Sequence, residues 1–388
     1  MKQDTKLVHL AREKPKVEGT VNQPVYRAST IISPDMDSYI ERHAGDRRYE
    51  NVTYGATGTH NAKTLADAVA DLEGGHKAIV TASGLSAVTL AICALVGAGD
   101  HVLVTDSVYG PTRKFCSEVM ARYGVEATFY DPRISPAALQ ALLRKNTKLV
   151  YLEAPGSLTF EMQDIPGLAA VAKAAGVLTA MDNTWATPLG FRPLEHGVDI
   201  SIQAGTKYLA GHSDLVIGMI TANDADLFRR IADHVMAFGD VAGPDDCYLT
   251  LRGMRTLGVR LARQQASALS VAGWLREQAA VHAVLYPALP GDNGYDLYQR
   301  DFTMGASLFG LALKTPDLDA VRRMVNGLEY FHLGSSWGGY ESLIAVNLMP
   351  LPRDQIPWEE TSYLLRLHVG LEDPDDLIAD LAQGLARL

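Results

Sequence analysis

The sequence has few cysteines and no closely spaced histidines, and both absences exclude classes of protein. Its 388 residues contain three cysteines, Cys93, Cys116 and Cys247, which cannot all pair and form no CxxC motif. A disulfide framework, a cysteine-based zinc site and a dithiol redox centre are therefore not expected. The 11 histidines occur singly and HExxH is absent, so the sequence predicts no metal site.

Long hydrophobic runs and excess positive charge are missing as well. The longest nearly unbroken apolar stretch, Ala87–Ala98, is well below the roughly 20 residues that cross a bilayer. The first 16 residues carry charges throughout, unlike a signal peptide. The chain has 35 Lys and Arg residues against 45 Asp and Glu residues, a formal charge of −10. We expect a cytoplasmic protein with neither a membrane nor a nucleic acid as partner.

Residues 1–60 contain scattered prolines and no long periodic pattern, so we predict that they form an extended N-terminal arm. Beyond them, Leu65, Val69 and Leu72 recur at the spacing of one helical face, and Gly74 with Gly75 ends that helix. Hydrophobic residues make up 47% of the chain, an ordinary value for a globular protein. A chain of this length is long enough to form two sizeable hydrophobic cores after the arm.

Short apolar segments alternate with helical patterns over residues 61–255, which is typical of βαβ units and a mostly parallel sheet. After a long helical pattern around Arg252–Gln265 the strands become sparse, which indicates a smaller C-terminal α+β domain over residues 256–388. The large α/β domain is predicted to have a mostly parallel, seven-stranded sheet made of Ala78–Thr81, His101–Thr105, Ala127–Tyr130, Leu149–Leu152, Val177–Met181, Ile200–Ile202 and Val216–Ile220.

Two charged residues directly follow predicted strands of the large domain. Asp182 comes after Val177–Met181, and Lys207 follows Ile200–Ile202 in a glycine-rich turn. Ligands of parallel sheets bind beyond the carboxyl ends of the strands, so both side chains are expected at one edge of the sheet. Each also has an ordinary explanation on its own, a helix cap for Asp182 and a surface position for Lys207.

A glycine-containing junction and an aromatic residue belong to the same predicted edge. The strand Ala78–Thr81 leads through Ser83 and Gly84 into a helix whose first N–H groups offer a seat for a phosphate, although the junction is equally an ordinary helix cap. Tyr109 lies in the loop after His101–Thr105. A phosphate seat, an aromatic platform, a carboxylate and a lysine are the parts that a pyridoxal phosphate site requires. The sequence contains neither GxxxxGK[ST] nor a GxGxxG after a strand, so neither common nucleotide-binding motif is present.

Eight segments, spread in sequence order over nearly the whole chain, match those of a known enzyme family. Through these segments the chain resembles the Cys/Met metabolism group of fold-type-I pyridoxal-phosphate enzymes, which implies a transferase-like α/β fold. The segments are VNQPVYRAST (21–30), LEGGHKAIVTASGLSA (72–87), APGSLTFEMQDIP (154–166), MDNTWATP (181–188), DISIQAGTKYLAGHSDLVIG (199–218), LRGMRTLGVRL (251–261), SSWGGYESLI (335–344) and LLRLHVGLEDPDDLIADL (364–381).

The resemblance implies a role for each candidate residue around the cofactor. Lys207 is expected to hold pyridoxal phosphate covalently and to act in catalysis. Asp182 is expected at the ring nitrogen, and Tyr109 is expected to stack on the ring, to contact substrate and to assist catalysis. The phosphate is expected to be held by Gly84, Leu85 and Thr206.

The resemblance also implies a substrate site and a partner subunit. Arg366 is expected to bind the substrate α-carboxylate, for which its planar fork is suited, with Ser336 and Trp337 beside it. The alternative, a surface arginine of a strand, is disfavoured by the position of Arg366 inside LLRLHVGLED. Tyr54 matches a tyrosine of the arm that family members lend, for catalysis and cofactor binding, to the neighbouring subunit. A homo-oligomer, a tetramer built as a dimer of dimers, is therefore expected.

Two positions depart from the family pattern. Family members commonly have an arginine two residues after the lent tyrosine, where it reaches the partner's cofactor phosphate, and this chain has Ala56. Many members also have a serine where this chain has Ala204, two residues before Thr206. Thr57, Thr59 or Asn61 are candidate neutral substitutes. Losing one charge-assisted contact costs roughly 1.5–3 kcal/mol, so the sequence predicts weaker cofactor retention.

The activity implied by the resemblance is carbon–sulfur β-elimination on a small sulfur amino acid. L-cystathionine would give homocysteine, pyruvate and ammonia, a step of methionine biosynthesis. Trp337 favours β-chemistry, because γ-acting relatives tend to carry a smaller aliphatic residue there, although core packing is its simpler explanation. The alternatives are a cysteine-S-conjugate lyase or cysteine desulfhydrase, a γ-lyase or γ-synthase, a racemase side activity, and a non-catalytic binding module. Retention of Lys207 and Asp182 disfavours the last.

Overall fold

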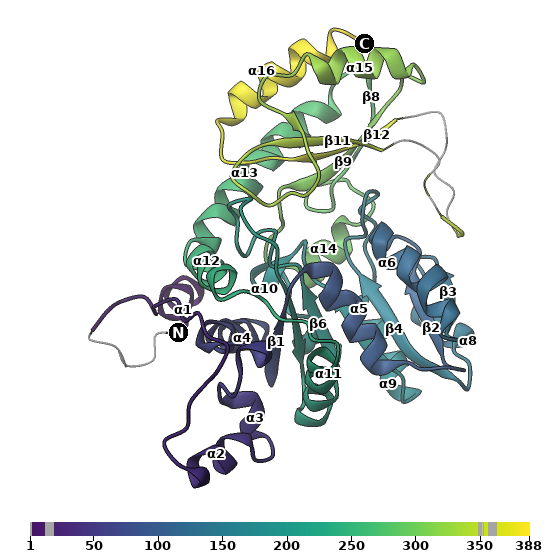
Figure 1. Ribbon diagram of the computed structural model, residues 1–388. Helices are drawn as coiled ribbons and strands as arrows, with labels where there is room; N and C mark the ends of the chain where they lie inside the picture. The colour runs from purple at the N-terminus through teal and green to yellow at the C-terminus, as the bar shows by residue number, and fades with distance from the viewer. Residues whose placement is uncertain (1, 12–18, 348–350, 352, 356–362) are drawn as a thin grey trace.

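The computed structural model describes the whole chain apart from residues 1, 12–18, 348–350, 352 and 356–362. Two sheets organise it: a large sheet in the lower half of Figure 1 and a smaller one above it. The element pattern predicted from the sequence, one large α/β unit followed by a smaller α+β unit, is confirmed. Each strand of the large sheet lies within about two residues of its predicted bounds.

The large sheet has seven strands in the order β1-β7-β6-β5-β4-β2-β3. Neighbours from β6 to β3 run parallel, whereas β7 is antiparallel to both β1 and β6. The carboxyl ends of β2, β4, β5 and β6 therefore share one edge. The strands are β1 (Lys77–Thr81), β2 (His101–Thr105), β3 (Glu126–Tyr130), β4 (Thr147–Glu153), β5 (Leu178–Asp182), β6 (Ile200–Gln203) and β7 (Gly218–Ala222).

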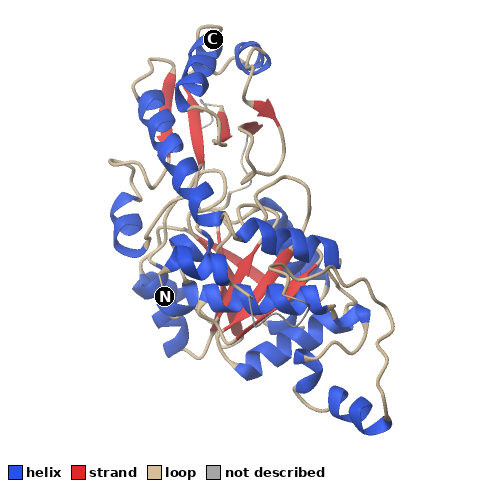
Figure 2. Cartoon of the chain, turned by 90° about the vertical axis from the view of Figure 1, so that its left-hand side faces the viewer, coloured by secondary structure: helices blue, strands red, loops and turns tan. Residues whose placement is uncertain are grey.

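Helices cover both faces of this sheet (Figure 2), because its central strands are apolar on both sides. One face packs under α4 and α9, and the opposite face packs under α5 and α11. The helices of this part are α4 (His60–Glu73), α5 (Gly84–Leu95), α6 (Gly110–Lys114), α7 (Met120–Arg122), α8 (Pro136–Leu142), α9 (Ile165–Ala174), α10 (Thr187–Gly190), α11 (Ala225–Ala237) and α12 (Pro244–Met254).

The smaller sheet has five strands in the order β10-β11-β12-β9-β8, and only β10 pairs in parallel. Its core is continuous with the core under α4 and α9, so the two units share one hydrophobic interior. The elements are α13 (Leu257–Arg276), β8 (Val281–Leu285), α14 (Tyr295–Asp301), β9 (Leu308–Leu313), α15 (Leu318–Asn326), β10 (His332–Leu333), β11 (Leu343–Asn347), β12 (Leu364–His368) and α16 (Pro374–Leu385).

The N-terminal arm is less irregular than the sequence predicts. It contains the helices α1 (Gln3–His9), α2 (Met36–His43) and α3 (Arg47–Glu50), which are too short for their periodicity to stand out. The arm extends along the large unit at the lower left of Figure 1. The helical pattern around Arg252–Gln265 also divides, since α12 ends before α13 begins.

Among the described residues, no helix is long and apolar enough to cross a membrane. All three cysteines carry unpaired thiols. The described part also contains no group of three or more His, Cys, Asp or Glu side chains arranged to hold a metal ion.

Candidate active site

The residues predicted to carry the chemistry lie at the carboxyl edge of the large sheet. Asp182 is the last residue of β5 and Tyr109 follows β2, while Lys207 lies in the turn after β6. β4 ends at Glu153, which is paired in register with Asp182. The parallel arrangement thus places two carboxyl groups side by side at this edge.

Lys207 is held between the two units of the chain. Its Nζ donates a hydrogen bond to Ser336 Oγ at 2.6 Å and lies 5.4 Å from the ring centroid of Trp337. Burial, aided by the charge of Arg366, lowers the pKa of Lys207 to about 8, while Asp182 opposes this change. An amine with this pKa has a sizeable neutral fraction near physiological pH, and only the neutral amine attacks an aldehyde or accepts a proton.

The paired carboxyl groups of Asp182 and Glu153 differ in what shifts their pKa values. Burial raises the pKa of Asp182, whereas the Thr184 N–H at 3.0 Å and the charge of Lys207 lower it. Burial and the neighbouring Asp182 raise the pKa of Glu153 to about 8. Glu153 is therefore the member that holds a proton near neutrality, whereas the charge of Lys207 favours the ionised form of Asp182.

Glu153 also fixes the loop that carries Tyr109. Its Oε2 accepts the backbone N–H of Tyr109 at 2.8 Å, and its Oε1 accepts the hydroxyl of Ser157 at 2.6 Å. Burial, and then the charge of Asp182, raise the pKa of Tyr109, which disfavours its phenolate. The phenol ring of Tyr109 is thus anchored through the backbone beside the two carboxyl groups.

The start of α5, where the sequence predicts a phosphate seat, has backbone N–H groups that are free to bind an anion. Ser83 caps the helix through Ser86 N–H at 3.0 Å, and within the described part of the chain the N–H groups of Gly84 and Leu85 have no acceptor. A Cβ on Gly84 would lie 2.5 Å from the Cβ of Ala204, so the backbone approach needs glycine here. N–H groups at a helix N-terminus suit a phosphate.

Two further groups modify this seat. The Thr206 hydroxyl is already engaged, because it donates to the Ile217 carbonyl at 3.1 Å and accepts the Ile217 N–H at 2.9 Å. The Asp240 carboxylate accepts the Ala82 N–H at 2.7 Å and the hydroxyl of Ser86. A carboxylate at the same helix end competes electrostatically with a phosphate.

Arg366 enters from β12 of the smaller sheet. One of its guanidinium nitrogens donates to the Ser336 carbonyl at 3.0 Å, and burial lowers its pKa while Tyr109 opposes that change. Trp337 packs against Tyr208, with ring centroids 5.3 Å apart. The Ser336–Trp337 turn therefore connects Arg366 with Lys207, and an amino acid bound by both would have its Cα between them.

The structure does not bring every predicted residue into this site. Tyr54 has a half-exposed side chain, and in the described part of the chain it makes no hydrogen bond, ion pair or ring contact with Lys207, Asp182 or Tyr109. Ala56 lines a separate cavity of about 120 Å³ together with Asp240. Tyr54 thus makes none of the contacts that were predicted for it within the described part of its own chain.

Sequence reasoning missed Glu153 and Asp240. For Glu153 a signal was available, since it ends the apolar strand β4 just as Asp182 ends β5. For Asp240 no comparable signal exists, because its contacts with Ala82 and Ser86 join residues more than 150 positions apart.

Together, the fold and the site define a pyridoxal-phosphate-dependent enzyme. The donor set fits the cofactor: a buried amine of lowered pKa for the aldehyde, a carboxylate for the ring nitrogen, and unused helix N–H groups for the phosphate. The chain belongs to the Cys/Met metabolism PLP-dependent enzyme family, whose sequence profile matches residues 4–386. The predictions of family, fold and cofactor are thereby confirmed.

The relatives carry more than one activity in their names. The chain is 44% identical to a putative cystathionine beta-lyase of Rhizobium johnstonii, covering 99% of this chain and 96% of that protein. It is 39% identical to the cystathionine beta-lyase MetC of Escherichia coli, covering 100% and 99%. It is also 38% identical to an L-alanine/L-glutamate racemase of Wolbachia pipientis, covering 100% and 98%.

A solved structure agrees with the fold over the full length. The cystathionine gamma synthase of Xanthomonas oryzae pv. oryzae, in complex with cystathionine, superposes with a TM-score of 0.91 at 30% identity. The match covers 100% of this chain and 98% of that one. Fold alone therefore does not separate β-elimination from γ-chemistry in this family.

Proposed function

We propose that the protein is a carbon–sulfur β-lyase that cleaves L-cystathionine to homocysteine, pyruvate and ammonia. The observation that carries the proposal is the Ser336–Trp337 turn, which places a large indole against Lys207 and joins it to Arg366. The curated names of relatives that match the whole chain support the same activity. The reaction belongs to methionine biosynthesis, and the free cysteines and acidic charge fit a cytoplasmic enzyme.

Each residue has a defined task in this reaction. Bound pyridoxal phosphate supplies an electron sink for the carbanion formed at Cα. Arg366 binds the substrate α-carboxylate, and Lys207, as the neutral amine, removes the Cα proton. Asp182, whose ionised form the charge of Lys207 favours, would stabilise a protonated ring nitrogen, while Glu153 beside it holds a proton. Lys207 then returns its proton to the departing thiolate.

The proposal extends to domains and subunits. We assign residues 1–60 to an arm, 61–255 to the cofactor domain and 256–388 to the C-terminal domain. We also propose a homo-oligomer, a dimer of dimers, in which Tyr54 of each arm serves the neighbouring site. The half-exposed Tyr54, which makes no hydrogen bond or ring contact with Lys207, Asp182 or Tyr109 among the described residues, supports this arrangement.

Product analysis tests the reaction. Cofactor-loaded protein is incubated with L-cystathionine, and the keto acid and thiol are identified by mass spectrometry. We expect pyruvate with homocysteine, and loss of both products in Lys207→Ala. Lys148→Ala, which removes an exposed lysine of β4, is the matched control and retains turnover. Formation of 2-oxobutyrate with cysteine would replace the proposal with γ-lyase chemistry.

Racemisation is the second candidate, because a relative that matches the full length of the chain is named a racemase. Lys207 and Tyr109 are both proton carriers next to the expected Cα position, which is the arrangement that two-sided proton transfer needs. Chiral chromatography after incubation with L-alanine and L-glutamate tests it. D-enantiomers formed faster than pyruvate from L-cystathionine would make racemisation the main activity.

A further inference from the structure

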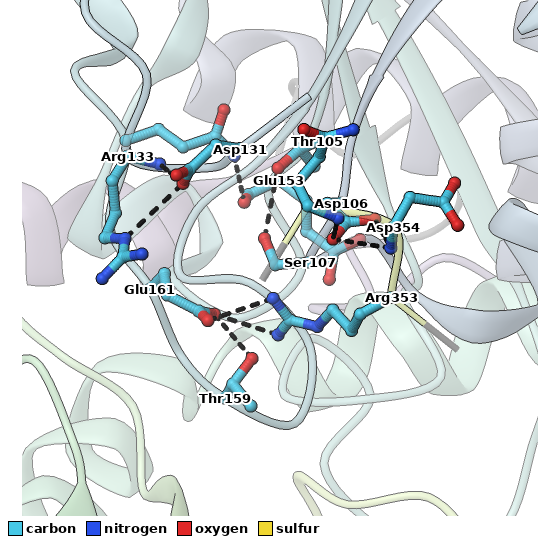
Figure 3. A network of polar contacts seen from close by, with 12 residues as sticks. Thr105, Asp106, Ser107, Asp131, Arg133, Glu153, Thr159, Glu161, Arg353 and Asp354 are labelled. Atoms are coloured by element: carbon cyan, nitrogen blue, oxygen red, sulfur yellow. Dashed lines mark hydrogen bonds and ion pairs between the residues drawn. The ribbon is translucent and has the colours of Figure 1, made fainter. Parts of the chain in front are cut away.

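A short segment of the C-terminal unit is bound to the loop that follows β2 by a network of charged and polar contacts. Residues 353–355 belong to the connection between β11 and β12, the strand that carries Arg366. They contact the cofactor domain at Asp106, which follows β2 and lies three residues before Tyr109, and at Glu161 (Figure 3). The segment therefore connects the strand that binds the α-carboxylate with the loop that holds the tyrosine ring.

Asp106 is the centre of the first contact. Its carboxylate, whose side chain is 0% exposed, accepts the backbone N–H of Asp354 at 3.1 Å and that of Gln355 at 2.9 Å. It is also paired with Arg113, which in turn reaches Asp354 at 3.3 Å and stacks on the ring of Phe129 at 3.8 Å. Backbone N–H groups and a guanidinium thus surround one anion.

Glu161 makes the second contact. Arg353 donates to both of its carboxylate oxygens, at 3.1 and 3.2 Å, which is the bidentate geometry of a strong ion pair. The two side chains are only 5% and 17% exposed, and Thr159 donates a further hydrogen bond to Glu161 at 2.6 Å. Figure 3 shows the carboxylates of Asp106 and Glu161 facing the same short segment.

Buried ion pairs add little net stability, because desolvation offsets their attraction, but they do fix one geometry. Here every charge is matched within the described network, so none of these groups is available to bind substrate itself. We propose that Asp106 and Glu161 are positioning residues that hold 353–355 as the outer wall of the pocket for the distal arm of the substrate. We call Asp106, Arg113, Glu161, Arg353 and Asp354 the interdomain latch.

The inference rests on the proposed function, because it concerns the substrate side chain beyond the sulfur. Cystathionine carries a second ammonium and carboxylate on that arm, whereas β-chloro-L-alanine undergoes the same elimination with no arm at all. Loss of the contacts that hold 353–355 should therefore weaken the binding of cystathionine and leave the turnover of β-chloro-L-alanine nearly unchanged. A residue that only maintains the fold would affect both alike.

The test compares Arg353→Gln and Asp106→Asn with the matched control Asp131→Asn. Asp131 follows β3 as Asp106 follows β2, but its pair with Arg133 is solvent-exposed and separate from the latch. For the two latch variants we expect faster hydrogen exchange at the amides of Asp354 and Gln355. We also expect a KM for cystathionine about tenfold higher, the usual effect of losing a charge-assisted contact. Turnover of β-chloro-L-alanine stays within about twofold of wild type.

A charge-reversed double variant distinguishes loss of the ion pair from misfolding. Combining Glu161→Arg with Arg353→Glu restores the ion pair, so the double variant should recover cystathionine binding that each single variant loses. Equal losses with both substrates, or unchanged exchange at the two amides, would overturn the inference. If wild type eliminates chloride from β-chloro-L-alanine but does not cleave cystathionine, the proposed function fails separately. The latch is then judged by amide exchange and by inhibition of that turnover by cystathionine.

Discussion

Glu73, the last residue of α4, places a carboxyl group in a fully buried position. Its Oε1 accepts a hydrogen bond from Gln203 at 2.8 Å, while its Oε2 and the side-chain oxygens of Asn183 and Gln203 have no partner among the described residues. Burial raises the pKa of Glu73 to about 7, which Gln203 only partly opposes. The group is a proton-binding site of the folded state close to the cofactor edge.

The raised pKa of Glu73 makes stability depend on pH. The folded form holds the proton up to about pH 7, whereas the unfolded form releases it near the ordinary glutamate pKa of 4.5. Stability from this group is fully present below pH 4.5 and is lost as pH rises to 7, by roughly 3 kcal/mol in total. Glu73→Gln keeps the acceptor for Gln203 and removes this penalty.

Thermal unfolding of cofactor-loaded protein measures this effect. At pH 8 Glu73→Gln should unfold at a higher temperature than wild type, and the difference should shrink toward pH 5. Glu118→Gln, at an exposed position, serves as the control and should follow wild type at every pH. A difference that grows on acidification would show that Glu73 is ionised in the folded protein.

At the scale of residues, the sequence predicts site residues whose neighbouring sequence is distinctive. It misses contacts between residues that are far apart in the sequence. Asp182 and Lys207 are predicted correctly as neighbours because each follows a strand of one parallel sheet. The hydrogen bond from Lys207 to Ser336 joins residues 129 positions apart and is outside local reasoning. The engagement of the Thr206 hydroxyl by Ile217 likewise depends on how two loops meet.

At the scale of elements, α5 is the helix whose first N–H groups we propose to bind the cofactor phosphate. Its apolar sequence predicts a buried helix, and Gly84 at its first position permits the approach to Ala204. Its actual N-terminal environment is set by Asp240, which lies between α11 and α12. A residue on one element thus changes the chemistry at the end of another.

We predict that Asp240→Asn retains pyridoxal phosphate longer than wild type. The amide oxygen still accepts one hydrogen bond at the start of α5, and the negative charge next to the phosphate is gone, which we expect to lengthen retention roughly threefold to tenfold. Cofactor fluorescence in the dialysate gives the release rate. Asp226→Asn removes a highly exposed charge of α11 and should release cofactor at the wild-type rate. Faster loss from Asp240→Asn would mean that Asp240 supports the seat.

Elements with strong periodicity are predicted well, and short or exposed ones are not. Strand β2 is buried at every position, so its bounds are predicted to the residue. The break between α12 and α13 carries no glycine or proline that would mark it in the sequence. The two-residue strand β10 is too short and too exposed to give a pattern.

At the scale of the whole molecule, one subunit does not account for all the predicted site residues. Tyr54 makes no hydrogen bond or ring contact with Lys207 within the described part of the chain, and the sequence predicts the roles of Tyr54 and Ala56 only through resemblance. Local patterns cannot specify a contact between two copies of a chain. The proposed exchange of arms therefore needs a test that separates a residue's own subunit from its neighbour.

Mixing two inactive variants provides that test. In a hybrid of a Lys207→Ala subunit with a Tyr54→Ala subunit, exchanged arms create one site with both native residues and one site with neither. Random pairing at equal amounts then restores about one quarter of all sites in the mixture, and about one half of the sites in the purified hybrid. Co-expression with two different affinity tags, purification of the hybrid and the pyruvate assay measure this recovery. If Tyr54 serves its own subunit, every site in the hybrid lacks one of the two residues, and the mixture stays as inactive as its parents.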